Sequence, residues 1–297
     1  MDIRAILMGL AFAAMWSSAF TSARIIVADA PPLMALALRF AISGALAVLL
    51  ARLMGQSWHL TRNQWKATII FGICQNALYL GLNFVAMQRI EASLAAIIAS
   101  SMPLLVGVAG WVFAGQRISP LGLIGLIAGF CGVVIIMSAR LGAGADLFGV
   151  GLCLLGVISL TVATLSLRNA SSGGNFMMIV GLQMLIGSAV LWPVGLVLET
   201  ATVNMSLKLV LAFIYTTLVP GLAATLVWFW LVNRIGAVKA ATFHFLNPFL
   251  GVAIAAVILS EQLGAMDILG VVIITFGILA VQIARQTGGT ETNSTAK

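Results

Sequence analysis

The chain has 297 residues, of which 62% are hydrophobic and only 8% are charged, and its mean hydropathy is +1.14. A soluble domain carries about 25% charged residues, because its exterior has to meet water. This composition excludes a soluble globular fold, and lipid must be the solvent for most of the surface.

The formal net charge of +7 does not indicate a nucleic-acid-binding protein. The basic residues are scattered singly along the sequence and form no patch or stripe interleaved with aromatic residues. A modest positive excess is expected of a multispanning inner-membrane protein, which keeps basic residues at the cytoplasmic ends of its spans. Three cysteines, Cys74, Cys131 and Cys153, lie inside apolar runs without a CxxC spacing, so neither a metal site nor a disulfide is predicted.

Ten apolar runs of about 18 or more residues follow one another along the chain, each long enough to cross a bilayer as a helix. The predicted fold class is therefore an all-α polytopic membrane protein. The predicted spans are 5–27, 33–53, 66–88, 91–113, 120–139, 147–167, 174–198, 207–231, 236–259 and 265–284.

The distribution of basic residues predicts the orientation. With the N-terminus in the cytoplasm, ten of the fifteen basic residues fall on the inner side. The outer side keeps Arg24, Arg39, Arg89, Arg140 and Lys208. We therefore expect both termini of this inner-membrane protein to be cytoplasmic.

The second half of the chain resembles the first at an offset of 145 residues. This offset pairs Arg89-Ile90 with Arg234-Ile235, Ala92 with Ala237, Pro103 with Pro248, Gly125 with Gly270 and Gly132 with Gly277. Each half holds five spans, and because five is odd the second half enters the membrane with the opposite orientation. The predicted organisation is a repeat over residues 1–143, an inverted repeat over 144–286 and a disordered polar tail over 287–297.

The paired prolines point to a functional site. A proline inside a span removes a backbone hydrogen bond, which is tolerable only against protein or a cavity. Matched interruptions in corresponding spans are typical of a transporter's binding site near the middle of the membrane. In the fifth span, Gly122, Gly125, Gly129 and Gly132 lie along one side and predict close helix packing, which we expect within the chain, with a dimer contact as the alternative.

Longer segments repeat as well. The first half contains RIEASLAAIIASSMPLL and closes with GQRIS, and the second contains RIGAVKAATFHFLNPFL and closes with SEQLG, each before a glycine-bearing last span. With ten spans in two repeats, the whole chain resembles the drug/metabolite transporter (DMT) superfamily, in particular its EamA family, and within it the YddG-type amino-acid exporters. The resemblance implies a central cavity surrounded by the first four spans of each half. The acid that usually follows the glycine of the closing motif is replaced here by Gln116.

Polar residues inside the spans are the candidates for the site. No Asp, Glu or Lys lies near the middle of a predicted span, so a proton relay is not indicated. His244 lies four residues before Pro248 on the same helix face, and it either lines the cavity or bonds a neighbouring helix. Asn247, next to Pro248, and Ser100, before Pro103, either bind a zwitterionic substrate or satisfy carbonyls that the prolines leave free.

Other candidates come from four more spans. Gln75, Tyr79 and Asn83 share one face of the third span, which we expect to meet the cavity. Further predicted cavity residues are Trp16 and Ser17 in the first span, Thr161 and Thr164 in the sixth, and Trp228 in the eighth. Close helix contact is the alternative for the small hydroxyl residues, and an interfacial position is the alternative for Trp228.

We therefore expect a secondary transporter that exports small amphipathic metabolites or facilitates their passage, with amino acids, including aromatic and other neutral ones, as substrates. Export of other metabolites or drugs, or a non-transporting scaffold or lipid scramblase, remain the alternatives. An enzyme is not expected, because no nucleophile with a base, metal cluster or paired carboxylates is present, and no phosphate-binding loop indicates an ATP-driven pump. The expected partners are a small-molecule substrate and membrane lipid, without a cofactor, and a monomer is compatible with the sequence.

Overall fold

The computed structural model describes residues 3–114, 119–166 and 173–294. These residues form helices and connecting turns without a strand, and ten of their helical segments are long and apolar enough to cross a membrane. The segments are Ile3–Asp29, Pro32–Leu53, Arg62–Ala86, Ala92–Phe113, Pro120–Gly142, Leu147–Ser166, Phe176–Leu198, Leu207–Ile235, Lys239–Leu259 and Ala265–Ala284. The predicted spans are confirmed, and their ends differ by at most four residues.

The helices group into two compact units, each of which takes elements from both repeats. The first unit comprises Met1–Thr21, Ala92–Leu147 and Ala224–Lys297, and the second comprises Ser22–Glu91 and Phe148–Ala223. The first helix, α1 (Ile3–Asp29), contributes to both units. The sequence-based boundaries at residues 143 and 286 and the disorder of residues 287–297 stay predictions, and the last helix continues to Ser294.

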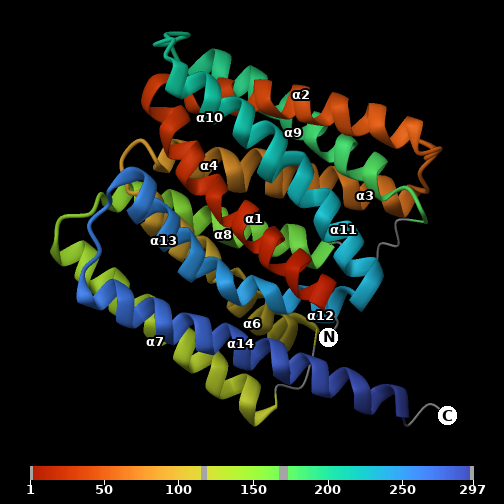
Figure 1. Ribbon diagram of the computed structural model, residues 1–297, viewed down its shortest axis with the longest axis vertical. Helices are drawn as coiled ribbons and strands as arrows, with labels where there is room; N and C mark the ends of the chain where they lie inside the picture. Colours follow the sequence, from red (N-terminus) through yellow and green to blue (C-terminus); the bar gives the residue numbers. More distant parts are fainter. Residues whose placement is uncertain (1–2, 115–118, 167–172, 295–297) are drawn as a thin grey trace. The chain divides into compact units, whose positions relative to one another are not determined.

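The first unit contains a long antiparallel helix pair, α7 and α14, which lie side by side in Figure 1. Its elements besides the start of α1 are α5 (Ala92–Ser100), α6 (Met102–Ala114), α7 (Pro120–Gly142), α11 (Ala224–Ile235), α12 (Ala237–Ala241), the 3-10 helix η3 (Thr242–Leu246), α13 (Asn247–Leu259) and α14 (Ala265–Ser294). A Cβ atom on Gly125 would lie 2.7 Å from the carbonyl oxygen of Gly277, so these backbones touch. The predicted glycine packing within the chain is confirmed.

The second unit is built on the pair α2 and α9, which also lie side by side in Figure 1. Its elements besides the end of α1 are α2 (Pro32–Leu53), α3 (Arg62–Phe71), the π-helix η1 (Gly72–Tyr79), α4 (Leu80–Ala86), α8 (Leu147–Ser166), α9 (Phe176–Leu198), α10 (Leu207–Leu218) and the π-helix η2 (Val219–Ala223). Gly44 and Gly181 meet where α2 and α9 approach, since a Cβ on Gly44 would lie 3.0 Å from the Gly181 carbonyl oxygen.

Side chains that follow one span cap the first turn of another. In the second unit, the Glu199 carboxylate accepts hydrogen bonds from the backbone N–H groups of Leu33 (2.8 Å) and Met34 (2.9 Å). In the first unit, Glu261 accepts from Ala92 (2.8 Å) and Ser93 (2.9 Å) in the same way. Such bonds satisfy N–H groups that have no partner within their own helix.

The inverted repeat extends to these caps. Met178 is equivalent to Leu33 at the offset of 145, and its N–H donates to the amide oxygen of Gln56 at 3.0 Å. The fourth equivalent position, Gln116, lies outside the described residues. Glu261, in the closing motif of the second repeat, thus bonds the start of a span of the first repeat.

Candidate functional site

Four spans depart from α-helical geometry at corresponding positions of the two repeats. In the third span this is η1, and the offset of 145 carries Gly72–Tyr79 onto residues 217–224, which contain η2 of the eighth span. The fourth span is broken between Ser100 and Met102, and the ninth span becomes the 3-10 helix η3 at the equivalent place. Irregular backbone at membrane depth is tolerated where it is enclosed by protein or lines a cavity, and π-helical turns are frequent at functional sites. Each unit contains two of these segments, and in each unit they mark where the candidate site residues lie.

In the first unit, four rings gather around η3, and we call them the aromatic cluster: Phe12, Trp16, Trp228 and His244. The ring centroids of Phe12 and Trp228 are 4.7 Å apart, and the imidazole of His244 lies 5.2 Å from Trp228 and 6.4 Å from Trp16. Phe12 and Trp16 come from α1 and Trp228 from α11, so three separate segments of the chain meet here. Rings at these separations attract one another through edge-to-face and offset contacts.

One side of the aromatic cluster is polar. The side-chain nitrogen of Asn247 lies 2.9 Å from Nδ1 of His244. An amide nitrogen only donates, so with this amide orientation Nδ1 accepts and the proton of a neutral imidazole is on Nε2. The Asn247 Oδ1 atom is buried and has no hydrogen-bond partner among the described residues. A buried acceptor without a donor is unfavourable, and a ligand that donates a hydrogen bond would satisfy it.

Five of the predicted site residues thus come together in the first unit: Trp16, Ser17, Trp228, His244 and Asn247. The Ser17 hydroxyl lies 3.5 Å from the Asn247 carbonyl oxygen. The alternative of a histidine bonded to a neighbouring helix is not what the geometry gives, because its bonded partner Asn247 belongs to the same span. Trp228 is half-buried, whereas nearby Trp230 is 54% exposed and suits an interfacial position better.

The remaining predicted site residues of the first unit lie at the interruptions of the fourth and ninth spans. Pro248 is buried and stands in the first turn of α13, directly after η3. Pro103 is buried near the start of α6. The Ser100 hydroxyl donates to the carbonyl of Ala96 at 2.7 Å, so this side chain is used by its own helix. Of the two interpretations of Ser100, this geometry favours satisfaction of a backbone carbonyl.

In the second unit, Tyr79 and Asn83 are buried, with 3% and 1% of their surfaces exposed. The Asn83 amide donates to the Tyr79 carbonyl at 2.8 Å and accepts from the Cys153 thiol, whose sulfur is 3.3 Å away. Both ends of the amide are therefore occupied, and Asn83 connects α4 to α8. Gln75, the third residue of the predicted face, is only half-buried.

The two predicted threonines of α8 bond their own helix. Thr161 and Thr164 donate to the carbonyls of Val157 and Leu160, each at 2.8 Å. Ser159 of α8 bonds η1, because its hydroxyl donates to the Cys74 carbonyl at 2.8 Å. Close helix contact is thus the role that the structure shows for this hydroxyl.

Sequence reasoning missed two residues that the structure brings forward. Phe12 lies at the centre of the aromatic cluster, but a phenylalanine in an apolar run gives no signal. Arg39 was expected among the outer basic residues, yet it lies seven residues inside α2 and is 6% exposed. The signal was present, because Arg39 is the one charged residue between Pro32 and Ala51, and an isolated charge within a span indicates function.

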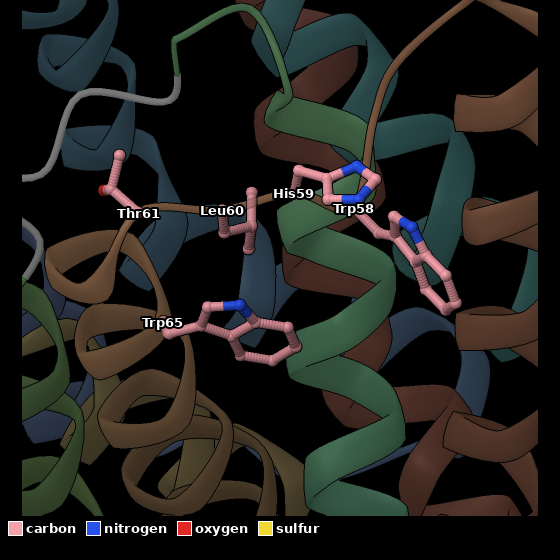
Figure 2. Close-up of a pocket in the computed structure, with 5 residues that line it drawn as sticks. All are labelled: Trp58, His59, Leu60, Thr61 and Trp65. Atoms are coloured by element: carbon pink, nitrogen blue, oxygen red, sulfur yellow. The ribbon is translucent and has the colours of Figure 1, made fainter.

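A hollow of about 520 Å³ lies in the connection between α2 and α3, and none of the predicted site residues lines it. Figure 2 shows its lining: Trp58, His59, Leu60, Thr61 and Trp65. The His59 ring lies beside the Trp58 indole, and Trp58 is 60% exposed. Tryptophans at the end of a span are typical of the membrane–water interface, so we assign this hollow to the interface and not to substrate.

Each unit by itself offers binding groups: ring faces, an imidazole and an amide in the first unit, and a phenol in the second. Among the described residues, no three or more His, Cys, Asp or Glu side chains form a group that could hold a metal ion. Apolar walls with a few polar groups are typical of binding sites for small molecules.

Comparisons with known proteins agree with this architecture. Residues 3–138 and 147–282 each match the family model described as the EamA-like transporter family. The chain is 26% identical to "Uncharacterized transporter YvbV" of Bacillus subtilis, covering 90% of this chain and 88% of that protein. It is 26% identical to "Uncharacterized inner membrane transporter YedA" of Escherichia coli K12, covering 91% and 88%. A crystal structure that is 19% identical superimposes with a TM-score of 0.70 over 95% of this chain and 98% of that chain, which shows a common fold.

Proposed function

Because the chain belongs to the EamA-like transporter family and is a multispanning membrane transporter, we propose that it exports amino acids and related small metabolites across the inner membrane, or facilitates their passage. Aromatic and other neutral amino acids are the proposed substrates. The observation that carries this proposal is the aromatic cluster beside the His244–Asn247 pair, with its buried acceptor oxygen. Ring faces suit an apolar side chain, and the polar pair suits the amine or carboxyl group that accompanies it.

The proposed mechanism is alternating access. The two repeats are inverted, and spans three, four, eight and nine are interrupted at matched positions. In transporters of this architecture, interrupted spans surround the substrate and one group of helices moves relative to another. Spans of the first unit are joined by the Glu261 cap, and spans of the second by the Glu199 and Gln56 caps, so we expect each unit to move as a body.

A flux measurement tests the substrate class. The purified chain is reconstituted in liposomes, and uptake of radiolabelled phenylalanine and other amino acids is followed with and without unlabelled competitor and an imposed pH gradient. We expect saturable uptake that a competitor suppresses. No flux of any amino acid through a well-folded preparation would contradict the amino-acid assignment and favour other metabolites, drugs, or a scramblase or scaffold role.

The chain offers matched controls for the site, because it contains only two histidines and two tyrosines. His244→Ala and Tyr79→Ala change predicted cavity residues, whereas His59→Ala and Tyr215→Ala change the exposed members of each pair. We expect the first two variants to raise the KM or abolish uptake, and the second two to retain it. Equal losses in both members of a pair would contradict the proposed site.

A further inference from the structure

We propose that Arg39, together with Ser43 and the π-helix η2, forms a binding site for a carboxylate group. This inference rests on the proposed function, since it identifies the part of the substrate that carries negative charge. Arg39 lies about 10 Å along α2 from its start, at the helical rise of about 1.5 Å per residue. α2 is long and apolar enough to cross a membrane, and Arg39 lies about two turns from the start of this span.

The guanidinium of Arg39 lacks the partner that a buried cation requires. Its Nε atom is buried and makes no hydrogen bond, and no described acidic side chain forms an ion pair with it. Two acids of the same unit are engaged at helix ends, since Glu199 bonds the first turn of α2 and Asp29 accepts from Asn204 and Ser206. The Phe40 ring, 5.3 Å away, is the contact that the structure gives this charge. An anion is the partner that would balance it.

The Ser43 hydroxyl and the backbone of η2 lie beside the Arg39 guanidinium. A Cβ placed on Gly221 in η2 would lie 3.6 Å from Nη2 of Arg39, 3.4 Å from the Ser43 hydroxyl and 3.1 Å from the Thr216 carbonyl oxygen, so these groups meet at the backbone of η2. The Ser43 hydroxyl, one turn along α2, makes only a long contact of 3.4 Å to the Thr217 carbonyl and can turn to a ligand. The guanidinium and the hydroxyl thus present their donors to the same stretch of η2 at Gly221.

A carboxylate fits these donors. The guanidinium presents parallel N–H groups that match the two oxygens of a carboxylate, and the hydroxyl can add a third hydrogen bond. A buried arginine that is held without an anion is unfavourable for the folded protein, so its presence is explained by a ligand that arrives and leaves. The structural alternative is that Arg39 stabilises η2. In that case replacing Arg39 would lower the stability of the ligand-free protein, whereas the proposal predicts unchanged or higher stability.

The test compares an anion with its neutral counterpart on the full chain purified in detergent. Phenylacetate and phenylacetamide share their shape and differ in charge, and their binding is measured from the shift in the thermal unfolding midpoint. We expect phenylacetate to stabilise the wild-type protein more than phenylacetamide does. Arg39→Gln should remove the difference and weaken phenylacetate binding about 10- to 100-fold, the loss expected for a charge-assisted hydrogen-bonded pair.

Two further variants sharpen the test. Arg52→Gln removes a positive charge from the exposed end of the same helix and should leave the difference between the two probes unchanged. Ser43→Ala should weaken phenylacetate binding by a smaller factor than Arg39→Gln. Without ligand, Arg39→Gln should unfold at the same temperature as wild type or higher, whereas a structural role predicts a lower temperature and would overturn the proposal.

Equal stabilisation of the wild type by both probes would also overturn it, as would a difference that persists in Arg39→Gln. The outcome is independent of the flux assay. Discrimination between phenylacetate and phenylacetamide without amino-acid flux leaves the carboxylate site in place and contradicts the amino-acid assignment. Amino-acid flux without discrimination between the two probes contradicts the carboxylate site and leaves the amino-acid assignment in place.

Discussion

Gly132 of α7 faces Gly270 of α14 so closely that a Cβ atom on Gly132 would lie 2.8 Å from the Gly270 carbonyl oxygen. The inverted repeat makes this contact the counterpart of the one between Gly125 and Gly277, because the offset of 145 converts Gly125 into Gly270 and Gly132 into Gly277. The two repeats therefore meet through a pair of equivalent backbone contacts. Close contact of this kind replaces the hydrophobic effect, which does not act between helices in lipid.

We expect Gly132→Ala to destabilise the protein. The added methyl group would also lie 2.8 Å from Ile274, so either α14 or its side chains must move. Overpacking of this kind costs about 1 to 3 kcal/mol. The measurement is thermal unfolding of the purified variant in detergent.

The matched control is Gly151→Ala in α8. No heavy atom lies within 4 Å of a Cβ placed on Gly151, so the methyl group meets no obstacle. Alanine favours a helix over glycine by up to about 1 kcal/mol, and this variant should be as stable as the wild type or more so. If Gly132→Ala and Gly151→Ala unfold at the same temperature, the α7–α14 contact is not tight.

Glu261 provides a second prediction. Its carboxylate bonds two backbone N–H groups at the start of α5, so Glu261→Ala should lower the free energy of unfolding by about 1 to 2 kcal/mol. Glu261→Gln keeps one acceptor oxygen, as Gln56 does in the other cap, and should cost less than the alanine variant. Thermal unfolding of both variants measures the difference.

The Glu199 cap serves as an internal comparison. Its two bonds have the same lengths as those of Glu261, 2.8 and 2.9 Å, so Glu199→Ala should cost a similar amount. An unchanged unfolding temperature in both alanine variants would show that these caps do not hold the helices together.

The sequence predicted the spans and the inverted repeat because both depend on regular features. An apolar run of 20 residues indicates a span whatever its neighbours are. Glycines and prolines at a constant offset indicate the repeat. The caps were not predictable, since a glutamate after one span gives no indication of which distant helix start it bonds. Gln116 therefore appeared only as a departure from a family motif.

Site residues were predicted less completely, because polarity within a span does not tell which partner a side chain finds. Asn83 was expected to face a cavity, but Cys153 of another helix occupies its oxygen. Arg39 was assigned to the outer side by the same rule that counts basic residues near span ends. Its burial depends on the packing of α2 against η2, which the sequence pattern does not contain.

Asn247 provides a prediction that separates binding from stability. Asn247→Leu removes the amide that bonds His244 and also removes the unpartnered Oδ1 atom, so the two effects on stability oppose each other. We expect little change in the unfolding temperature. Uptake in proteoliposomes should show a KM about 10-fold higher, the loss expected for a hydrogen bond to a charged amine.

Asn233→Leu is the control, because Asn233 is exposed near the end of α11. It should match the wild type in both KM and unfolding temperature. A normal KM in Asn247→Leu would contradict a role for this amide in substrate binding.

Substitution of Cys153 tests whether Asn83 connects two helices or binds the substrate. The Cys153 thiol donates to the Asn83 amide oxygen, and Cys153→Ala leaves that buried oxygen without a donor. This should destabilise the protein by about 1 to 3 kcal/mol. Cys153→Ser supplies a hydroxyl donor at the same place and should restore most of the loss. Thermal unfolding and uptake, measured on both variants, distinguish the two roles. A higher KM in Cys153→Ala at an unchanged unfolding temperature would assign Asn83 to substrate binding. In that case the thiol would matter for the amide that binds the ligand and not for the contact between the helices.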